Sequence, residues 1–382
     1  MSTKRGQAQT RLRCLLVVVV ALPVHAQTPP SAFPPPTEAA LQKILDKHLA
    51  RNGAPGAVVG VWIPSRGVWV RAQGLTDLET GAALEQVDHV RIGSITKTFV
   101  ATLILQLADA GLLGLDDALE SYVPGVLNGE QITIRHLLGM TSGVANVLED
   151  SDFLQAYESD RLMAFSPHAV LDIVRPHAAD FQPGEGFHYS ETNYFLLGII
   201  AEQVTGMPIT DAIDQWIIQP LGLRSTSLPT TADMPTPFSH GYAPTPNAGH
   251  ADVTLANPDV TWTAGAMVSN LDDLHVWTKA LATGALLSPE MQRERLQWTA
   301  VPGGEPLDAQ YGLGILSLAG FRGHNGGTPG YSSIAVYLPE ADATIVVLVN
   351  ELTLDGGPAD FLFYEIAGLL FPERFQSLQA RP

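Results

Sequence analysis

Hydrophobic and polar positions divide the chain into regions with different periodicities. Apolar residues recur at helical spacing over residues 37–52 and predict a helix there. Two short apolar runs follow, at 57–63 and 68–73, and each has the length and composition of a strand. Only four residues separate these runs, so the two strands must pair antiparallel.

The helical pattern dominates the middle of the chain, and strand-like runs return near its end. The helices expected in the middle include residues 116–122, 134–138, 193–204 and 272–281. The later strands are expected at 312–318, 333–338 and 344–350, and a last amphipathic helix at 359–370.

Strands at both ends and helices between them indicate an α+β fold. The simplest arrangement is one antiparallel sheet built from both chain ends and flanked by the terminal helices, with a mostly helical lobe inserted. We expect a sheet lobe at about 37–93 and 301–372, a helical lobe at about 94–300 and a tail at 373–382. Active sites favour such lobe junctions.

The first 26 residues have the features of an export signal. A basic start precedes an apolar stretch from Leu15 to Val24, and the sequence Val24-His25-Ala26 then comes before Gln27. We expect cleavage near Ala26, a periplasmic or secreted protein, and a mobile proline-rich leader at 27–36. The apolar stretch is short for a membrane span, although an uncleaved anchor is the alternative, and no later segment is long enough.

The composition and charge of the chain argue against several kinds of site and partner. Cys14 is the only cysteine and would leave with the signal, which excludes a disulfide, a thiol nucleophile and a cysteine-based metal site. The formal charge of −18 argues against a nucleic-acid partner. His240, His250 and Asp252 lack ligand spacing, and the acidic residues at 149–152 form a solvated turn, so we predict no metal and no cofactor. The sequence carries no signal for an oligomeric state.

Ser94 and Lys97 open a long apolar run with helical spacing. Residues three apart lie on one helix face, which brings the hydroxyl near the ammonium. A serine needs a neighbouring base, and a lysine among apolar side chains can act as one because its pKa falls. The Ser94 N–H at the helix start would also donate to an oxyanion. The alternative is that Ser94 caps the helix and Lys97 is solvated.

Two further segments carry candidate chemistry. In a glycine-rich loop, Tyr189 could relay a proton as a phenolate stabilised by nearby cations, or could be an ordinary loop tyrosine. Ahead of the 333–338 strand, His324, Asn325 and Gly326 would line the substrate edge. The N–H of Gly327 would be the second oxyanion donor. The alternative for His324 is a solvated strand end.

Ser94-x-x-Lys97, Tyr189-x-Glu191 and His324-x-Gly326 resemble, in this order, the three motifs of the penicillin-recognising serine hydrolases. This family comprises class C β-lactamases, D-Ala-D-Ala carboxypeptidases and related esterases. The resemblance covers residues 37–372 and implies a β-lactamase/transpeptidase-like fold, with an acyl-enzyme at Ser94 and His324 supporting Tyr189. The histidine at the start of the third motif resembles the carboxypeptidase and esterase branch of the family, because the β-lactamases usually have lysine at that position. Further similar phrases lie at 132–138, 141–143, 265–269 and 311–314.

The second motif departs from the family, in which asparagine normally stands at the position of Glu191. The nearest asparagine, Asn193, is displaced by two residues and is kept as a candidate substrate contact. An ionised carboxylate cannot donate to a substrate carbonyl, and it favours the ammonium form of Lys97. We hypothesise that Glu191 holds Lys97 or orients the hydrolytic water; alternatively it caps the next helix. Trp262 would line the cleft or pack in the core.

The sequence therefore predicts an exported serine hydrolase that cleaves a small amide or ester through an acyl-enzyme. The substrate would be a small molecule or a peptide, and the activity most like that of a D-Ala-D-Ala carboxypeptidase or a related esterase. One alternative is a class C-like β-lactamase that hydrolyses β-lactams. A different class is a receptor without catalysis that binds penicillin or cell-wall peptides.

Overall fold

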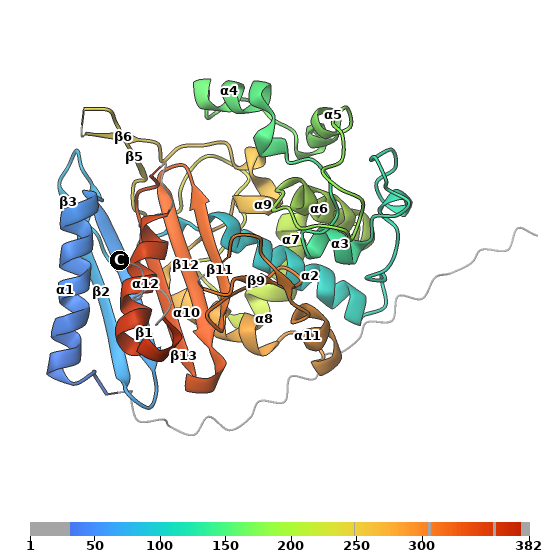
Figure 1. Cartoon of the computed structure of the whole chain (residues 1–382). Coiled ribbons are helices and arrows are strands. Elements are labelled where there is room, and N and C mark those ends of the chain that lie inside the picture. The colour runs from blue at the N-terminus through green and yellow to red at the C-terminus, as the bar shows by residue number, and fades with distance from the viewer. Residues whose placement is uncertain (1–30, 248, 305–306, 354–356, 376–382) are drawn as a thin grey trace, which may run out of the picture. The chain divides into compact units, whose positions relative to one another are not determined.

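A computed structural model describes residues 31–247, 249–304, 307–353 and 357–375 (Figure 1). The predicted export signal, its cleavage at Ala26, the first part of the leader and most of the tail lie outside these residues. Within the described residues, no helix is long and apolar enough to cross a membrane.

Both chain ends contribute to one antiparallel sheet of nine strands, in the order β3-β2-β1-β13-β12-β11-β10-β9-β8. The N-terminal and C-terminal parts join where β1 pairs with β13, with Val59 opposite Val347. This confirms the predicted α+β fold built on an antiparallel sheet. The strands are β1 Gly56–Ile63, β2 Gly67–Asp77, β3 Ala82–Ala83, β8 Thr299–Ala300, β9 Gln310–Tyr311, β10 Leu316–Leu318, β11 Phe321–Thr328, β12 Tyr331–Leu338 and β13 Ala343–Val349.

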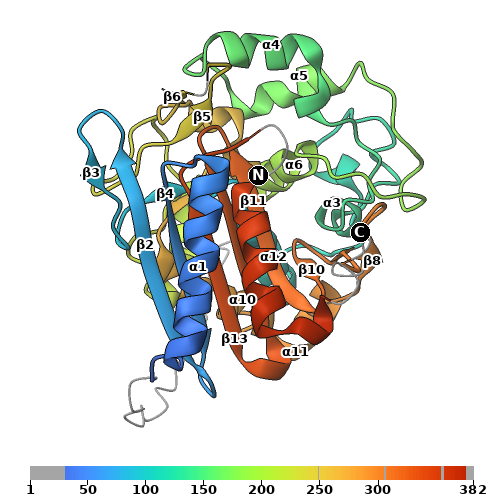
Figure 2. The same cartoon turned by 60° about the vertical axis from the view of Figure 1, so that its left-hand side comes forward.

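Helices cover both faces of this sheet. Helices α1 (Pro35–Asn52) and α12 (Pro358–Leu370) lie side by side on one face (Figure 2), and α10 (Leu271–Thr283) lies on the other. Successive residues of a strand point to opposite faces. Val347 accordingly packs in the core beneath α1 and α12, whereas Val346 packs in the core that includes α10. Because helices cover both faces of the sheet, β13 is buried along its whole length, and its apolar residues do not alternate with polar ones.

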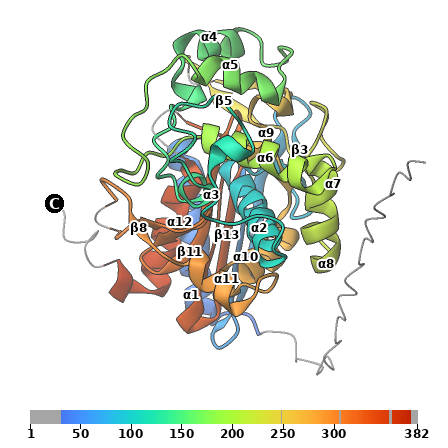
Figure 3. The same ribbon diagram turned by 90° about the vertical axis from the view of Figure 1, so that its right-hand side faces the viewer.

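The remaining helices lie beside the sheet, where α2, α6 and α9 pack together (Figure 3). Two small antiparallel pairs, β4 with β7 and β5 with β6, lie outside the nine-stranded sheet. These elements are α2 Thr96–Asp109, α3 Ile134–Leu138, α4 Ser151–Ser159, α5 Val170–Val174, α6 Thr192–Thr205, α7 Ile209–Ile213, α8 Gln219–Leu221, α9 Trp262–Gly265, α11 Pro289–Arg295, β4 Val90–Arg91, β5 Tyr242–Pro244, β6 His250–Asp252 and β7 Val268–Ser269.

Three expectations for local structure were wrong. The chain packs from Ser31, whose carbonyl accepts from the Val68 N–H at 3.0 Å, so the described end of the leader is ordered against β2. Residues 116–122 form only a short 3₁₀ turn. The expected strand at 312–318 is interrupted by a turn, in which the Gly312 N–H donates to the Ile315 carbonyl, because Gly314 has a φ of +70°.

Candidate active site

Ser94 and Lys97 lie together at the start of α2. Ser94 belongs to a short 3₁₀ helix, η1 (Gly93–Ile95), that runs directly into α2. The Lys97 Nζ lies 3.0 Å from the Ser94 Oγ, as the spacing of the two residues predicts. Ser94 caps neither helix and Lys97 is fully buried, so the alternative of a capping serine and a solvated lysine is wrong.

The surroundings of Lys97 suit a proton acceptor. Its Nζ also lies 2.8 Å from the Ala264 carbonyl oxygen and 3.4 Å from the Glu191 Oε1. Burial lowers the pKa of Lys97, and the Glu191 carboxylate opposes that shift without cancelling it. A larger fraction of Lys97 is therefore present as the free amine near neutral pH than for an exposed lysine.

Tyr189 lies over the lysine, with the Lys97 Nζ 4.8 Å from the centre of its ring. The ring is partly exposed, but its hydroxyl oxygen is buried and makes no hydrogen bond of standard geometry with the described residues. Burial and then the Glu191 carboxylate raise the pKa of Tyr189 well above its usual value, and the Ser94 hydroxyl opposes this. The expected phenolate is therefore disfavoured. The phenol keeps its proton and can donate it.

Strand β11 passes close to η1. A Cβ on Gly93, which has a φ of +53°, would lie 2.7 Å from the Gly327 N, and one on Gly326 would overlap the Ile92 carbonyl oxygen. The Ser333 hydroxyl fixes this approach by donating to the same carbonyl at 2.9 Å. Glycines at these positions let the exposed Gly327 lie beside the nucleophile.

His324 faces the site from β11 but is almost completely buried, with 2% of its surface exposed. Its Nε2 lies 3.1 Å from the Tyr311 Oη, and its Nδ1 lies 2.5 Å from the Asn325 carbonyl oxygen. Burial, together with the charge of Lys97, lowers the pKa of His324 to about 3. The imidazole is therefore neutral, and any electrostatic support that it gives Tyr189 comes without a positive charge.

Asn325 does not line the site as expected. Because side chains alternate along a strand, it points to the opposite face from His324. There its Nδ2 donates to the Asp360 Oδ1 of α12 at 3.1 Å.

Two other residues that were candidates for contact with the substrate, Asn193 and Trp262, are buried in the core. Asn193 is fully buried, accepts from the Ser142 hydroxyl at 2.6 Å and directs its Nδ2 to the Met140 Sδ at 3.3 Å. It therefore holds the chain before the second motif and does not reach Lys97. Trp262 is buried against Phe195, with ring centres 6.0 Å apart.

Glu191 points into the site. Its side chain is 15% exposed and makes no capping bond to α6, so the capping alternative is wrong. Its N–H donates to the Asn146 Oδ1 at 3.2 Å, which fixes the backbone ahead of the helix. The carboxylate can thus act on Lys97 directly.

Sequence reasoning missed Tyr311 and Asp360. Tyr311 is buried, and its ring meets that of Tyr189 edge to face at 6.0 Å. Tyr311 begins the phrase at 311–314 that already resembled the family, and this was the available signal. Asp360 had none, because its partner Asn325 lies 35 residues earlier in the chain.

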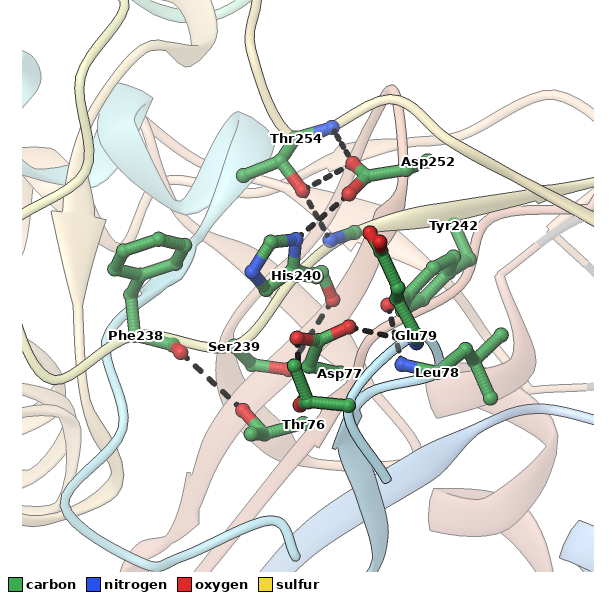
Figure 4. A network of polar contacts seen from close by, with 12 residues as sticks. Thr76, Asp77, Leu78, Glu79, Phe238, Ser239, His240, Tyr242, Asp252 and Thr254 are labelled. Atoms are coloured by element: carbon green, nitrogen blue, oxygen red, sulfur yellow. Dashed lines mark hydrogen bonds and ion pairs between the residues drawn. The ribbon is translucent and has the colours of Figure 1, made fainter. Parts of the chain in front are cut away.

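Several of the histidines and acids considered as metal ligands form histidine–carboxylate pairs instead. His240 points toward Asp252, with 2.7 Å from its Nδ1 to the Oδ2 (Figure 4). The turn at 149–152 is not merely solvated, because Glu149 lies 2.9 Å from the Nε2 of His188, whose Nδ1 contacts Asp180. Across the described ranges, no three such side chains are placed to hold a metal ion.

Comparisons with known proteins show the family and the fold. The family described as Beta-lactamase matches residues 41–367. The structure of a D-stereospecific amidohydrolase from Streptomyces sp. is 32% identical, covers 88% of this chain and 99% of its own, and has a TM-score of 0.78. The D-amino acid amidase from Ochrobactrum anthropi SV3 shares the fold, at 24% identity, a TM-score of 0.79, and coverage of 91% and 100%.

A penicillin-binding protein of Bacillus subtilis (strain 168) is 26% identical over 279 residues, which are 68% of this chain and 60% of that protein. The chain thus spans about 60% of the length of the curated relatives it matches.

Proposed function

The chain belongs to the β-lactamase family of serine hydrolases, and we propose that it cleaves a small amide or ester through an acyl-enzyme at Ser94. The observation that carries this proposal is the 3.0 Å contact between the Ser94 Oγ and the Nζ of the fully buried Lys97. The sequence favoured a carboxypeptidase or an esterase. Similarity to an amidohydrolase that is D-stereospecific adds amides of D-amino acids to the candidate substrates.

In the proposed reaction, the Ser94 Oγ attacks the carbonyl carbon and its proton passes to the free amine of Lys97. The C–N or C–O bond then breaks, and the Tyr189 phenol gives its proton to the departing group. The Lys97 ammonium returns a proton to Tyr189. Water completes the cycle by attacking the ester on Ser94, which releases the acid and restores the hydroxyl.

The backbone N–H groups of Ser94 and Gly327 are the proposed oxyanion donors. Replacement of Gly93 by alanine would force them apart, because the new Cβ would lie 2.7 Å from the Gly327 N. We expect kcat to fall about 10²- to 10³-fold, the usual effect of losing one such donor. Steady-state kinetics with a p-nitrophenyl ester measure the change.

Gly81→Ala is the matched control, because Gly81 also has a positive φ, of +72°, but a Cβ added there would meet no atom within 4 Å beyond its chain neighbours. It imposes the same kind of backbone strain without the close approach. Equal kcat values for the two variants would contradict the proposed oxyanion geometry.

For Glu191 we propose that the carboxylate holds Lys97 and orients the water that attacks the acyl-enzyme. Glu191→Gln removes the charge that raises the pKa of Lys97, so that pKa falls further. Acylation needs the free amine and is lost as the pH falls through this pKa. The acidic limb of kcat/KM should therefore move to lower pH, by about one unit or more. Deacylation should slow, which burst kinetics detect as accumulated acyl-enzyme.

Glu185→Gln in the same glycine-rich loop provides the control, because Glu185 is exposed and makes no ion pair in the described structure. An unchanged acidic limb together with unchanged deacylation in Glu191→Gln would refute both proposed roles.

A β-lactamase and a binding protein without turnover are the remaining candidates, and the Lys97–Glu191 pair is the observation that favours the second, since it stabilises the ammonium. Intact-mass measurement after exposure to a β-lactam, together with turnover assays on the β-lactam and on a p-nitrophenyl ester, distinguishes a β-lactamase and an esterase from a peptidase or a receptor. Stable labelling supports a peptidase or a receptor, rapid β-lactam turnover a β-lactamase, and turnover of esters alone an esterase. Export also remains our proposal, and sequencing the N-terminus of the protein from a periplasmic or culture fraction tests it.

A further inference from the structure

The Tyr189 side chain is not anchored through its own hydroxyl. That oxygen makes no hydrogen bond of standard geometry with the described residues. The ring lies against those of Tyr311 and His324, with ring centres 6.0 Å and 6.1 Å away. The position of the phenol oxygen therefore depends on how the backbone at 188–190 is fixed.

His188, the residue before Tyr189, lies between two carboxylates. Its Nδ1 is 2.5 Å from the Asp180 Oδ2, and its Nε2 is 2.9 Å from the Glu149 Oε1. Carboxylates only accept hydrogen bonds and a neutral imidazole has one N–H, so only the imidazolium donates to both. Burial lowers the pKa of His188, but Asp180 and then Glu149 outweigh burial and raise it above its usual value. The imidazolium thus bridges two groups of like charge.

The two carboxylates lie on segments that are themselves held in place. The Asp180 N–H donates to the Gly143 carbonyl at 2.9 Å. Glu149 ends a 3₁₀ turn, η3 (Val147–Glu149), and the Val147 N–H donates to the Thr192 Oγ1 at 2.9 Å, at the start of α6. His188 therefore joins two fixed segments on either side of the second motif.

We propose that His188 is a positioning residue, whose bridge from Asp180 to Glu149 fixes the backbone of Tyr189 and keeps the phenol aimed at the departing group. The inference rests on the proposed function and adds a residue to it that acts only through Tyr189. The bridge requires a cation, because both groups that it joins are anionic. This requirement distinguishes the proposed role from the filling of space.

Hydrogen exchange reports the bridge without any substrate. His188→Gln keeps a hydrogen-bond donor but removes the charge, and the amides at 186–192 should exchange at least about fivefold faster. His188→Arg keeps a cation and should exchange like the unmodified protein. His177→Gln is the matched control, because His177 forms a similar pair with Asp150, at 3.1 Å, but does not adjoin Tyr189. Unchanged exchange in His188→Gln overturns the inference.

Two esters, phenyl acetate and p-nitrophenyl acetate, separate the positioning of a proton donor from general damage. Phenolate is the stronger base and gains more from a donated proton, whereas p-nitrophenolate leaves readily as the anion. His188→Gln should lower kcat/KM about tenfold on phenyl acetate and less than about threefold on p-nitrophenyl acetate. His188→Arg should restore the first value. Equal losses on the two esters, no loss on either, or no restoration by arginine contradicts the proposed role.

Tyr189→Phe shows whether the effect passes through the phenol. In that background, His188→Gln should cause no further loss on phenyl acetate, because the group that it positions is already gone. A further loss as large as the one in the unmodified enzyme would show that His188 acts by another route.

Intact-mass measurement with p-nitrophenyl acetate separates the inference from the proposed function. An acetyl group on Ser94 supports the proposed function, whatever His188→Gln does. If that group forms and His188→Gln matches the unmodified protein in exchange and in kinetics, the inference alone fails. If Ser94 is never acylated, the proposed function fails, and the role of His188 in the reaction fails with it.

Discussion

Ser94→Ala is expected to reduce kcat on the order of 10⁴- to 10⁶-fold, the scale on which loss of a serine nucleophile acts in other hydrolases. The change removes only the hydroxyl group, whose oxygen forms the ester in the proposed reaction. The Lys97 amine, 3.0 Å away, would have no proton to accept. Steady-state kinetics with an ester, followed by intact-mass measurement of the labelled protein, give the result.

The matched control is Ser65→Ala, in the exposed turn between β1 and β2, which should keep full activity and full labelling. Thermal unfolding of both variants shows whether the fold is intact. A Ser94→Ala protein that still turns over substrate within tenfold of the unmodified enzyme would rule out Ser94 as the nucleophile.

Lys97→Met is expected to lower kcat/KM by about 10²- to 10⁴-fold, the usual contribution of a general base. Methionine fills similar space without a proton acceptor. Lys97→Arg should fail as well, because a guanidinium stays protonated at any working pH. Stopped-flow measurement of the acylation burst locates the defect in the first step.

The fold should survive Lys97→Met, because an apolar residue of similar volume avoids the desolvation of a buried ammonium. Glu191 loses its partner but stays 15% exposed to water. Lys43→Met on the exposed side of α1 controls for loss of one positive charge. A burst amplitude and rate like those of the unmodified enzyme would show that Lys97 is not the base.

Local sequence patterns predicted the elements that depend on nearby residues. Apolar runs at both ends of the chain indicated the strands of the central sheet, and the i, i+3 spacing indicated the contact between Ser94 and Lys97. Both follow from backbone geometry, in which strand length and helical periodicity repeat every few residues. The same reasoning failed at residues 312–318, where a glycine turn interrupts an apolar run.

Only the tertiary structure decided where the polar side chains of the motifs point. Asn325 turns away because Asp360 lies on the other face of the sheet, Asn193 is held by Ser142, and Glu191 reaches Lys97. Each of these partners is 35 or more residues away in the chain. The identities of the residues fixed which chemistry was available. The packing of distant segments determined which of those groups share the site and in which charge state.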